Sequence, residues 1–225
     1  MSDSSTDLFP RFRSARRADA GSRGPFPEWT TADTIALLGR DEPALTAFVA
    51  TAAATSFEAG AFFPLPPTGS VSLAGLNGRG GWAEDWPGFE SLAAFAYDWL
   101  GRLYVLESAK GPVGSVVARV EPEIGELTET GVPLGEFLNE FLVDDFDDVV
   151  ATGLRSEYLG SGRPKPGPGQ IVGYEVPLFL GGSDSIENMA PVDFRVYLSL
   201  SGQLATQANA VTPGSRVGRV NLSRD

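Results

Sequence analysis

The chain has 225 residues and a formal net charge of -12, from 17 basic and 29 acidic residues, and 42% of it is hydrophobic. This composition is enough to build a buried core, but the absence of His and Cys excludes an imidazole base, a Ser-His-Asp triad, a thiolate nucleophile and a disulfide framework. The acidic balance argues against nucleic-acid binding, because the phosphates would be repelled.

The N-terminal residues differ from the rest of the chain. Residues 1–27 hold five Arg against three Asp and show no apolar periodicity, so we predict a flexible basic tail. They lack the apolar core of a signal peptide, and no stretch of about 18 apolar residues follows. We therefore expect a cytoplasmic protein without membrane contact, in which residues 28–225 form one domain.

Helix signals open this domain. Thr30 and Asp33 have the spacing of a capping box, and apolar residues at helical spacing predict a second helix from Ala44 to Phe57. The Gly- and Pro-rich run at residues 60–67 should end any regular structure.

The middle of the chain has the alternation of strands. We predict a strand at Val71–Leu73, followed by a loop at residues 77–81. Leu100-Gly101 and residues 122–125 have turn residues between alternating segments and so predict two hairpins. The four predicted hairpin strands are residues 95–99, 102–106, 113–120 and 126–129.

Helices dominate the second half. An apolar stripe at helical spacing follows Pro133, and it comprises Leu134, Phe137, Leu138, Phe141 and Leu142. A second helix is predicted from Phe146 to Tyr158, a loop at residues 161–170, and a last helix capped by Asp193 with Val196, Tyr197, Leu200 and Leu204 on one face. Residues 213–220 would add a terminal strand. The sum is an α+β fold, with helices packed on a mostly antiparallel sheet.

The strongest charge feature is a run of six acids without a base. It comprises Glu136, Glu140, Asp144, Asp145, Asp147 and Asp148. Two interpretations remain open: a solvated helix face, with Asp near the N-terminus of the next helix, or an anionic docking surface for a basic partner. The run lacks the spacing and central Gly of a calcium loop, so we expect no metal site and no cofactor.

Aromatic residues follow the Gly-rich loop. Trp82, Trp86 and Phe89 stand beside Glu84 and Asp85, a combination that would suit a sugar-binding groove with two carboxylates. Aromatic residues after such a loop also commonly anchor it to the core. Both interpretations stay open.

Residues from about 95 to 220 resemble the SUKH superfamily and the related immunity proteins of type VI secretion effectors. The matching stretches are residues 97–102, residues 173–182, and a third set with Asn188, Asp193, Val196, Tyr197, Gln203, Leu204 and Gln207. The resemblance implies an SUKH-like part at residues 91–225, preceded by a helical and loop part at residues 28–90. It also implies structural framework roles for Trp99, Gly101, Pro177, Gly181, Gly182, Tyr197 and Gln203.

The resemblance further implies a protein without catalysis that neutralises a cognate toxin by binding it, and many such toxins are nucleases. An acidic protein can occupy the cationic groove that a nuclease offers to phosphates. We therefore expect as partner a toxin with a basic surface. The expected contacts are the six acids, with Trp82, Trp86 and Tyr158 as further anchors.

Two other functions compete with this one. A regulatory or scaffold module of the same fold would bind a partner that is not a toxin. A carboxylate-dependent glycoside hydrolase would use acids such as Glu84 and Asp85.

Overall fold

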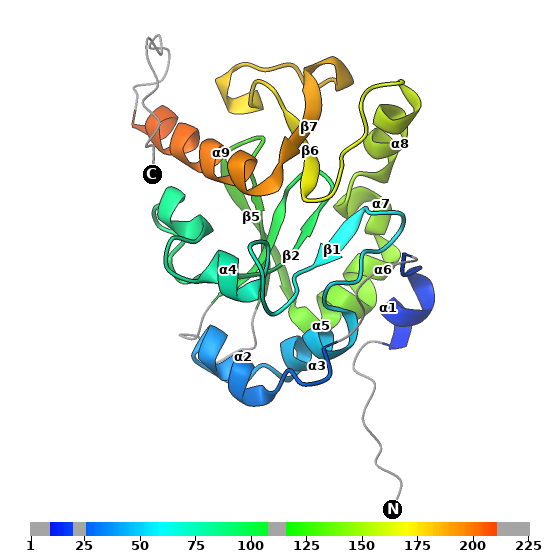
Figure 1. Cartoon of the computed structure of the whole chain (residues 1–225), viewed down its shortest axis with the longest axis vertical. Helices are drawn as coiled ribbons and strands as arrows, with labels where there is room; N and C mark the ends of the chain where they lie inside the picture. The colour runs from blue at the N-terminus through cyan, green and yellow to red at the C-terminus, as the bar shows by residue number, and fades with distance from the viewer. Residues whose placement is uncertain (1–9, 20–25, 108–115, 211–225) are drawn as a thin grey trace, which may run out of the picture.

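The computed structural model describes residues 10–19, 26–107 and 116–210. A five-stranded antiparallel sheet runs through the middle of the protein (Figure 1). Its strands lie side by side in chain order: β1 (Phe62–Pro64), β2 (Leu92–Asp98), β3 (Leu103–Glu107), β4 (Val116–Glu121) and β5 (Glu126–Pro133). Short turns join β2 to β3 and β4 to β5, which confirms the two predicted hairpins.

The turn between β2 and β3 depends on two residues. Gly101 has a φ of 78°, a left-handed conformation that costs glycine little. The Asp98 carboxylate accepts the N–H groups of Leu100 at 2.9 Å and Arg102 at 3.1 Å. These bonds close the hairpin and hold the Asp98 side chain in place, where it is fully buried.

Helices cover both faces of the sheet (Figure 1). In the first half of the chain they are α1 (Pro10–Ala15), α2 (Thr31–Leu38), α3 (Pro43–Ala52), α4 (Leu73–Asn77) and the 3-10 turn η1 (Trp82–Asp85). In the second half they are α5 (Leu134–Glu136), the π-helical turn η2 (Phe137–Phe141), α6 (Leu142–Asp144), α7 (Phe146–Val149), α8 (Thr152–Gly160) and α9 (Phe194–Asn209).

Aromatic contacts show which helices face which side. Tyr104 of β3 packs on Phe137 of η2, with ring centroids 5.7 Å apart. Tyr97, which pairs with the neighbouring residue Leu103, stacks on Phe194 of α9 at 4.3 Å. Adjacent strand residues point to opposite faces. The α5–α7 region and α9 therefore lie on opposite faces of the sheet.

A second, two-stranded sheet lies beside α9 and α8 (Figure 1). It pairs β6 (Gln170–Tyr174) with β7 (Met189–Asp193), and the connection between them carries η3 (Leu178–Leu180) and η4 (Ile186–Asn188). Residues 161–169 precede it as the predicted loop. Together the two sheets and their helices confirm the predicted α+β class.

The N-terminal segment differs from the predicted flexible tail. Residues 10–18 pack onto the fold, with Phe12 buried among Phe48, Phe57 and Phe62. Arg11 pairs with Asp144 at 2.7 Å. Periodicity could not predict this contact, because Phe12 stands alone between Arg11 and Arg13. Residues 1–9 and 20–25 lie outside the described residues.

Other boundaries were predicted with mixed success. The capping box of Thr30 and Asp33 is confirmed. The predicted strand at Val71–Leu73 is wrong, because the Ser72 hydroxyl instead accepts the Gly75 N–H and caps α4. The run at residues 60–67 contains β1, and α3 ends at Ala52 and not at Phe57. The predicted strand at residues 213–220 lies outside the described residues.

Candidate functional site

The run of six acids, residues 136–148, forms an irregular helical stretch that we call the acidic segment. It begins at α5, passes through the π-helical turn η2 and ends in α7. All six carboxylates are exposed. The apolar stripe between them faces the core, where Phe137, Leu138 and Leu142 are fully buried. Burial of this stripe fixes the stretch and leaves its acids in solvent.

Few of these carboxylates are neutralised. Within the described residues, Asp144 pairs with Arg11 at 2.7 Å, and Asp147 accepts a hydrogen bond from Thr152 at 2.7 Å. The Arg11–Asp144 pair is half exposed on both sides and is therefore worth less than about 1 kcal/mol. The acidic segment thus keeps a strongly negative field, and one of its six charges is already engaged by a cation.

Side chains of the sheet hold the far end of the acidic segment. Arg119 donates to the carbonyl of Val149 at 3.0 Å, and Tyr104 donates to the same oxygen at 3.3 Å. Trp99 donates its indole N–H to the Val150 carbonyl at 2.5 Å. Three donors from β3, β4 and the β2–β3 turn therefore satisfy two carbonyls that helix geometry leaves open. These bonds anchor the C-terminal end of the acidic segment to the sheet.

Two of these donors, Arg119 and Tyr104, also belong to a cluster of buried and partly buried charged groups, in which the Tyr104 hydroxyl lies 3.2 Å from an Asp98 carboxylate oxygen. Arg102 donates to Glu123 at 2.6 Å, and Arg119 pairs with Glu121 at 3.0 Å. Burial raises the pKa of Asp98 to about 7, although the Arg102 cation opposes this shift. One oxygen of Glu123 has no partner among the described residues. Buried charges of this kind must be paired, and here they join the two hairpin turns.

The structure contradicts three of the predicted contact residues. Trp82 and Trp86 are 4% and 3% exposed, and Tyr158 is fully buried. Trp86 donates to the Leu198 carbonyl at 2.9 Å, and the Tyr158 hydroxyl donates to the Pro164 carbonyl at 2.7 Å. These aromatic rings stabilise the core and are not available to a partner.

The carboxylates beside these tryptophans have structural contacts. Glu84 accepts the N–H of Gly80 at 2.6 Å, and Asp85 accepts the amide of Gln203 at 2.9 Å. The buried rings of Trp82 and Trp86 offer no exposed platform for a sugar. Nothing in this arrangement favours the hydrolase alternative.

The predicted framework positions occupy constrained places. Trp99 and Tyr197 are buried at 3% and 4% exposure, and the Tyr197 hydroxyl accepts the Tyr174 N–H at 3.3 Å. A side chain at Gly101 would meet Ile171 and Tyr197 at 3.2 to 3.3 Å.

The remaining framework positions surround η3 and α9. Pro177 is buried immediately before η3. Gly181 has a φ of 89°, and a Cβ at Gly182 would lie 1.9 Å from the Val176 carbonyl. Gln203 bridges α9 to Asp85. A structural role for these positions stays a prediction.

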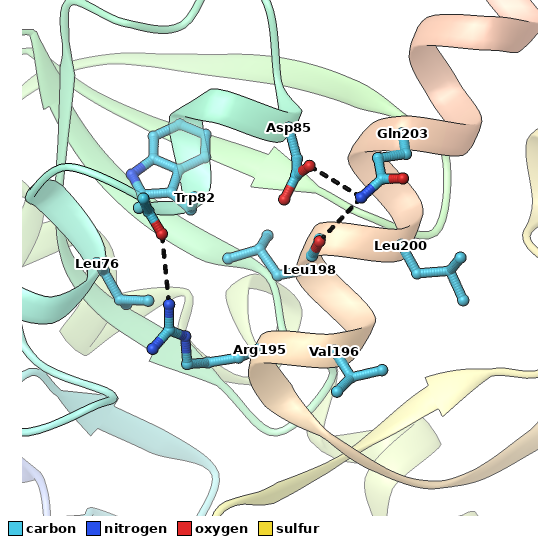
Figure 2. A pocket seen from close by; sticks show the side chains of 11 residues that line it. Leu76, Trp82, Asp85, Arg195, Val196, Leu198, Leu200 and Gln203 are labelled. Carbon is cyan, nitrogen blue, oxygen red and sulfur yellow. Dashed lines mark hydrogen bonds between the residues drawn. The ribbon is translucent and has the colours of Figure 1, made fainter. Parts of the chain in front are cut away.

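A pocket of about 480 Å³, which the sequence did not indicate, lies between α9 and the α4–η1 region (Figure 2). Its walls come from residues 76–85 and 195–203, more than a hundred positions apart in the chain. The predicted apolar face of α9 was partly wrong: Val196 is 56% exposed at this pocket, whereas Tyr197, Leu198 and Ala205 are buried.

Comparison with known proteins gives one family match. Residues 163–205 match the model described as "T6SS immunity protein Tdi1, C-terminal", which covers less than half of the chain. No curated protein matches. A solved structure, titled "Crystal structure of Atu4351 from Agrobacterium tumefaciens", aligns at 16% identity with a TM-score of 0.43, covering 66% of this chain and 69% of that one.

No helix within the described residues is long and apolar enough to cross a membrane. No group of three potential metal ligands converges within residues 10–19, 26–107 and 116–210.

Proposed function

We propose that this chain is an immunity protein that binds a cognate bacterial toxin and neutralises it without chemistry of its own. The observation that carries the proposal is the match of residues 163–205 to a type VI secretion immunity protein family. The matched residues include the β6–β7 sheet and most of α9. The proposal places the protein in the cytoplasm, with SUKH-like relatives as the sequence resemblance implies.

The acidic segment supplies the mechanism that we propose. Its carboxylates are exposed on a backbone held by Arg119, Tyr104 and Trp99. Preorganised charge of one sign speeds association with a surface of the opposite sign and selects that surface. A toxin with a cationic groove, such as a nuclease, is the partner whose charge fits best. Occupation of the groove would exclude its substrate.

The test is binding between the full chain and the protein encoded by the neighbouring gene. Affinity should fall steeply as salt is raised, because exposed charges are screened. A variant that neutralises part of the acidic segment should lose most of the association rate. It carries Asp144→Asn, Asp145→Asn, Asp147→Asn and Asp148→Asn.

A matched control separates the acidic segment from overall charge. It removes four other exposed carboxylates through Asp41→Asn, Glu126→Gln, Glu129→Gln and Glu157→Gln. The control should bind almost as the parent does. If both variants weaken binding equally, or if the folded acidic-segment variant binds and protects normally, the proposed mechanism is wrong.

A further inference from the structure

The pocket between α9 and the α4–η1 region lies on the face of the sheet opposite the acidic segment (Figures 1 and 2). Leu76, Leu198 and Leu200 contribute apolar atoms to its lining. At its rim, Val196 is 56% exposed, the highest value among the exposed large hydrophobic residues of the described chain. Val196 and the apolar lining beside it give a partner apolar surface to remove from water.

Asp85 gives the pocket a negative anchor. One carboxylate oxygen accepts the Gln203 amide at 2.9 Å, which fixes the side chain (Figure 2). No contact within the described residues engages the other oxygen, and no cation pairs with it there. A fixed carboxylate among apolar walls favours a cationic head group whose aliphatic stem packs on those walls.

Arg195 stands at the other end of the pocket. Its guanidinium reaches the Gly80 carbonyl only at 3.5 Å (Figure 2), the limit of a hydrogen bond, and the residue is exposed. Most of its five N–H groups therefore remain available to acceptors such as backbone carbonyls. The backbone carbonyls of a peptide could accept hydrogen bonds from Arg195 at one end of the pocket. A basic side chain of the same peptide could pair with the Asp85 carboxylate at the other end.

We propose that this pocket binds a segment of the partner protein in which Lys or Arg stands next to an apolar residue. The basic side chain pairs with Asp85, the apolar neighbour covers Val196, and Arg195 donates to the backbone carbonyls of the segment. A small ligand inside the pocket would leave the exposed rim uncovered, which favours a polypeptide. The net charge of -12 also favours a basic segment.

This inference deepens the proposed function and rests on it for the identity of the partner, the toxin. The α9 wall, residues 195–203, lies within the segment that matches the immunity family, whereas residues 76–85 lie outside it. Binding through both the acidic segment and the pocket would engage the partner on two sides of the sheet.

The experiment selects random linear peptides on the immobilised full chain and discards those that also bind Ser199→Trp, whose larger side chain fills the pocket. Enriched peptides should share a basic residue beside an apolar one. Their affinity should fall about tenfold or more in Asp85→Asn, which keeps an acceptor for Gln203 and loses the charge. Val196→Ser should also weaken binding, and the matched control Ile35→Ser, at another exposed apolar residue, should not.

Each outcome decides one question. The pocket proposal is overturned if no peptides are enriched or if the enriched peptides lack a basic residue. It is also overturned if the peptides bind Asp85→Asn and Val196→Ser as tightly as they bind the parent. These outcomes decide the question even if Ser199→Trp does not fold. Enriched peptides that compete with the neighbouring gene product support both proposals. Pocket-dependent peptides together with a neighbouring product that does not bind at all would uphold the pocket and overturn the proposed function.

Discussion

The guanidinium carbon of Arg16 lies 4.2 Å from the ring centroid of Phe146. The same guanidinium donates to the carbonyls of Leu142 and Val143, where a helical turn ends. The N-terminal segment thus supplies a cation both to an aromatic face and to the negative end of a helix. This contact ties residues 10–18 to the acidic segment, more than a hundred positions away.

Arg16→Ala should therefore destabilise the protein more than Arg11→Ala. We expect a loss of about 1–2 kcal/mol for Arg16, from a partly buried cation–π contact and two carbonyl bonds. Arg11 makes a half-exposed ion pair with Asp144 and should cost less than about 1 kcal/mol. Urea unfolding of both variants measures the difference. Equal losses would mean that the Arg16 contacts do not hold the segment.

Asp98 should make stability depend on pH. Burial raises its pKa from 3.8 to about 7, so the folded state binds the proton more tightly than the unfolded state does. Its stabilising contribution is therefore complete below about pH 4 and is lost as the pH rises to about 7. The chain has no His, and no other type of side chain normally titrates between about pH 5 and pH 8.

The measurement compares the free energy of unfolding at about pH 5 and about pH 7.5. The parent should be less stable at the higher pH. In Asp98→Asn the difference should shrink, because the amide keeps an acceptor for Leu100 and Arg102 and does not titrate. An unchanged pH dependence in this variant would show that another group is responsible.

Local periodicity predicted the parts of the fold that depend on neighbouring residues. The hairpin turns, the capping box and the buried stripe of the acidic segment all follow from short-range patterns, and the structure contains each of them. The burial of Phe12 and the cluster around Asp98 depend on residues far apart in the chain. A pattern of spacing carries no information about such contacts.

The pocket and α9 show the same limit. Helical spacing favoured a face with Val196 and Leu200, but α9 packs through a face that includes Ser201 and Gly202. Small residues permit close approach of neighbouring elements, and a Gly inside a helix commonly has a packing reason. Gly202 was therefore a signal in the sequence for the contact between α9 and η1.

Gly202→Ala tests this close approach. An added Cβ would lie 2.5 Å from the Asp85 carbonyl oxygen and from Trp86 Nε1, so we expect a loss of about 1–3 kcal/mol. The matched control is Gly153→Ala in α8, where a Cβ would meet nothing within 4 Å. It should gain about 0.5–1 kcal/mol from helix propensity. Thermal unfolding compares the two, and a stabilised Gly202→Ala variant would contradict the packing.

Trp82 and Trp86 form a second matched pair, because both indoles are buried and only one N–H is paired. Trp86 donates to the Leu198 carbonyl at 2.9 Å, whereas Trp82 Nε1 has no partner within the described residues. Replacement by Phe removes a similar apolar area at both sites, but Trp86→Phe also loses a hydrogen bond worth about 1 kcal/mol. Trp82→Phe removes an unsatisfied donor, which offsets part of its loss. Urea unfolding should therefore show Trp86→Phe as the less stable variant by about 1 kcal/mol or more, and the reverse order would mean that the Trp82 indole has a partner in solution.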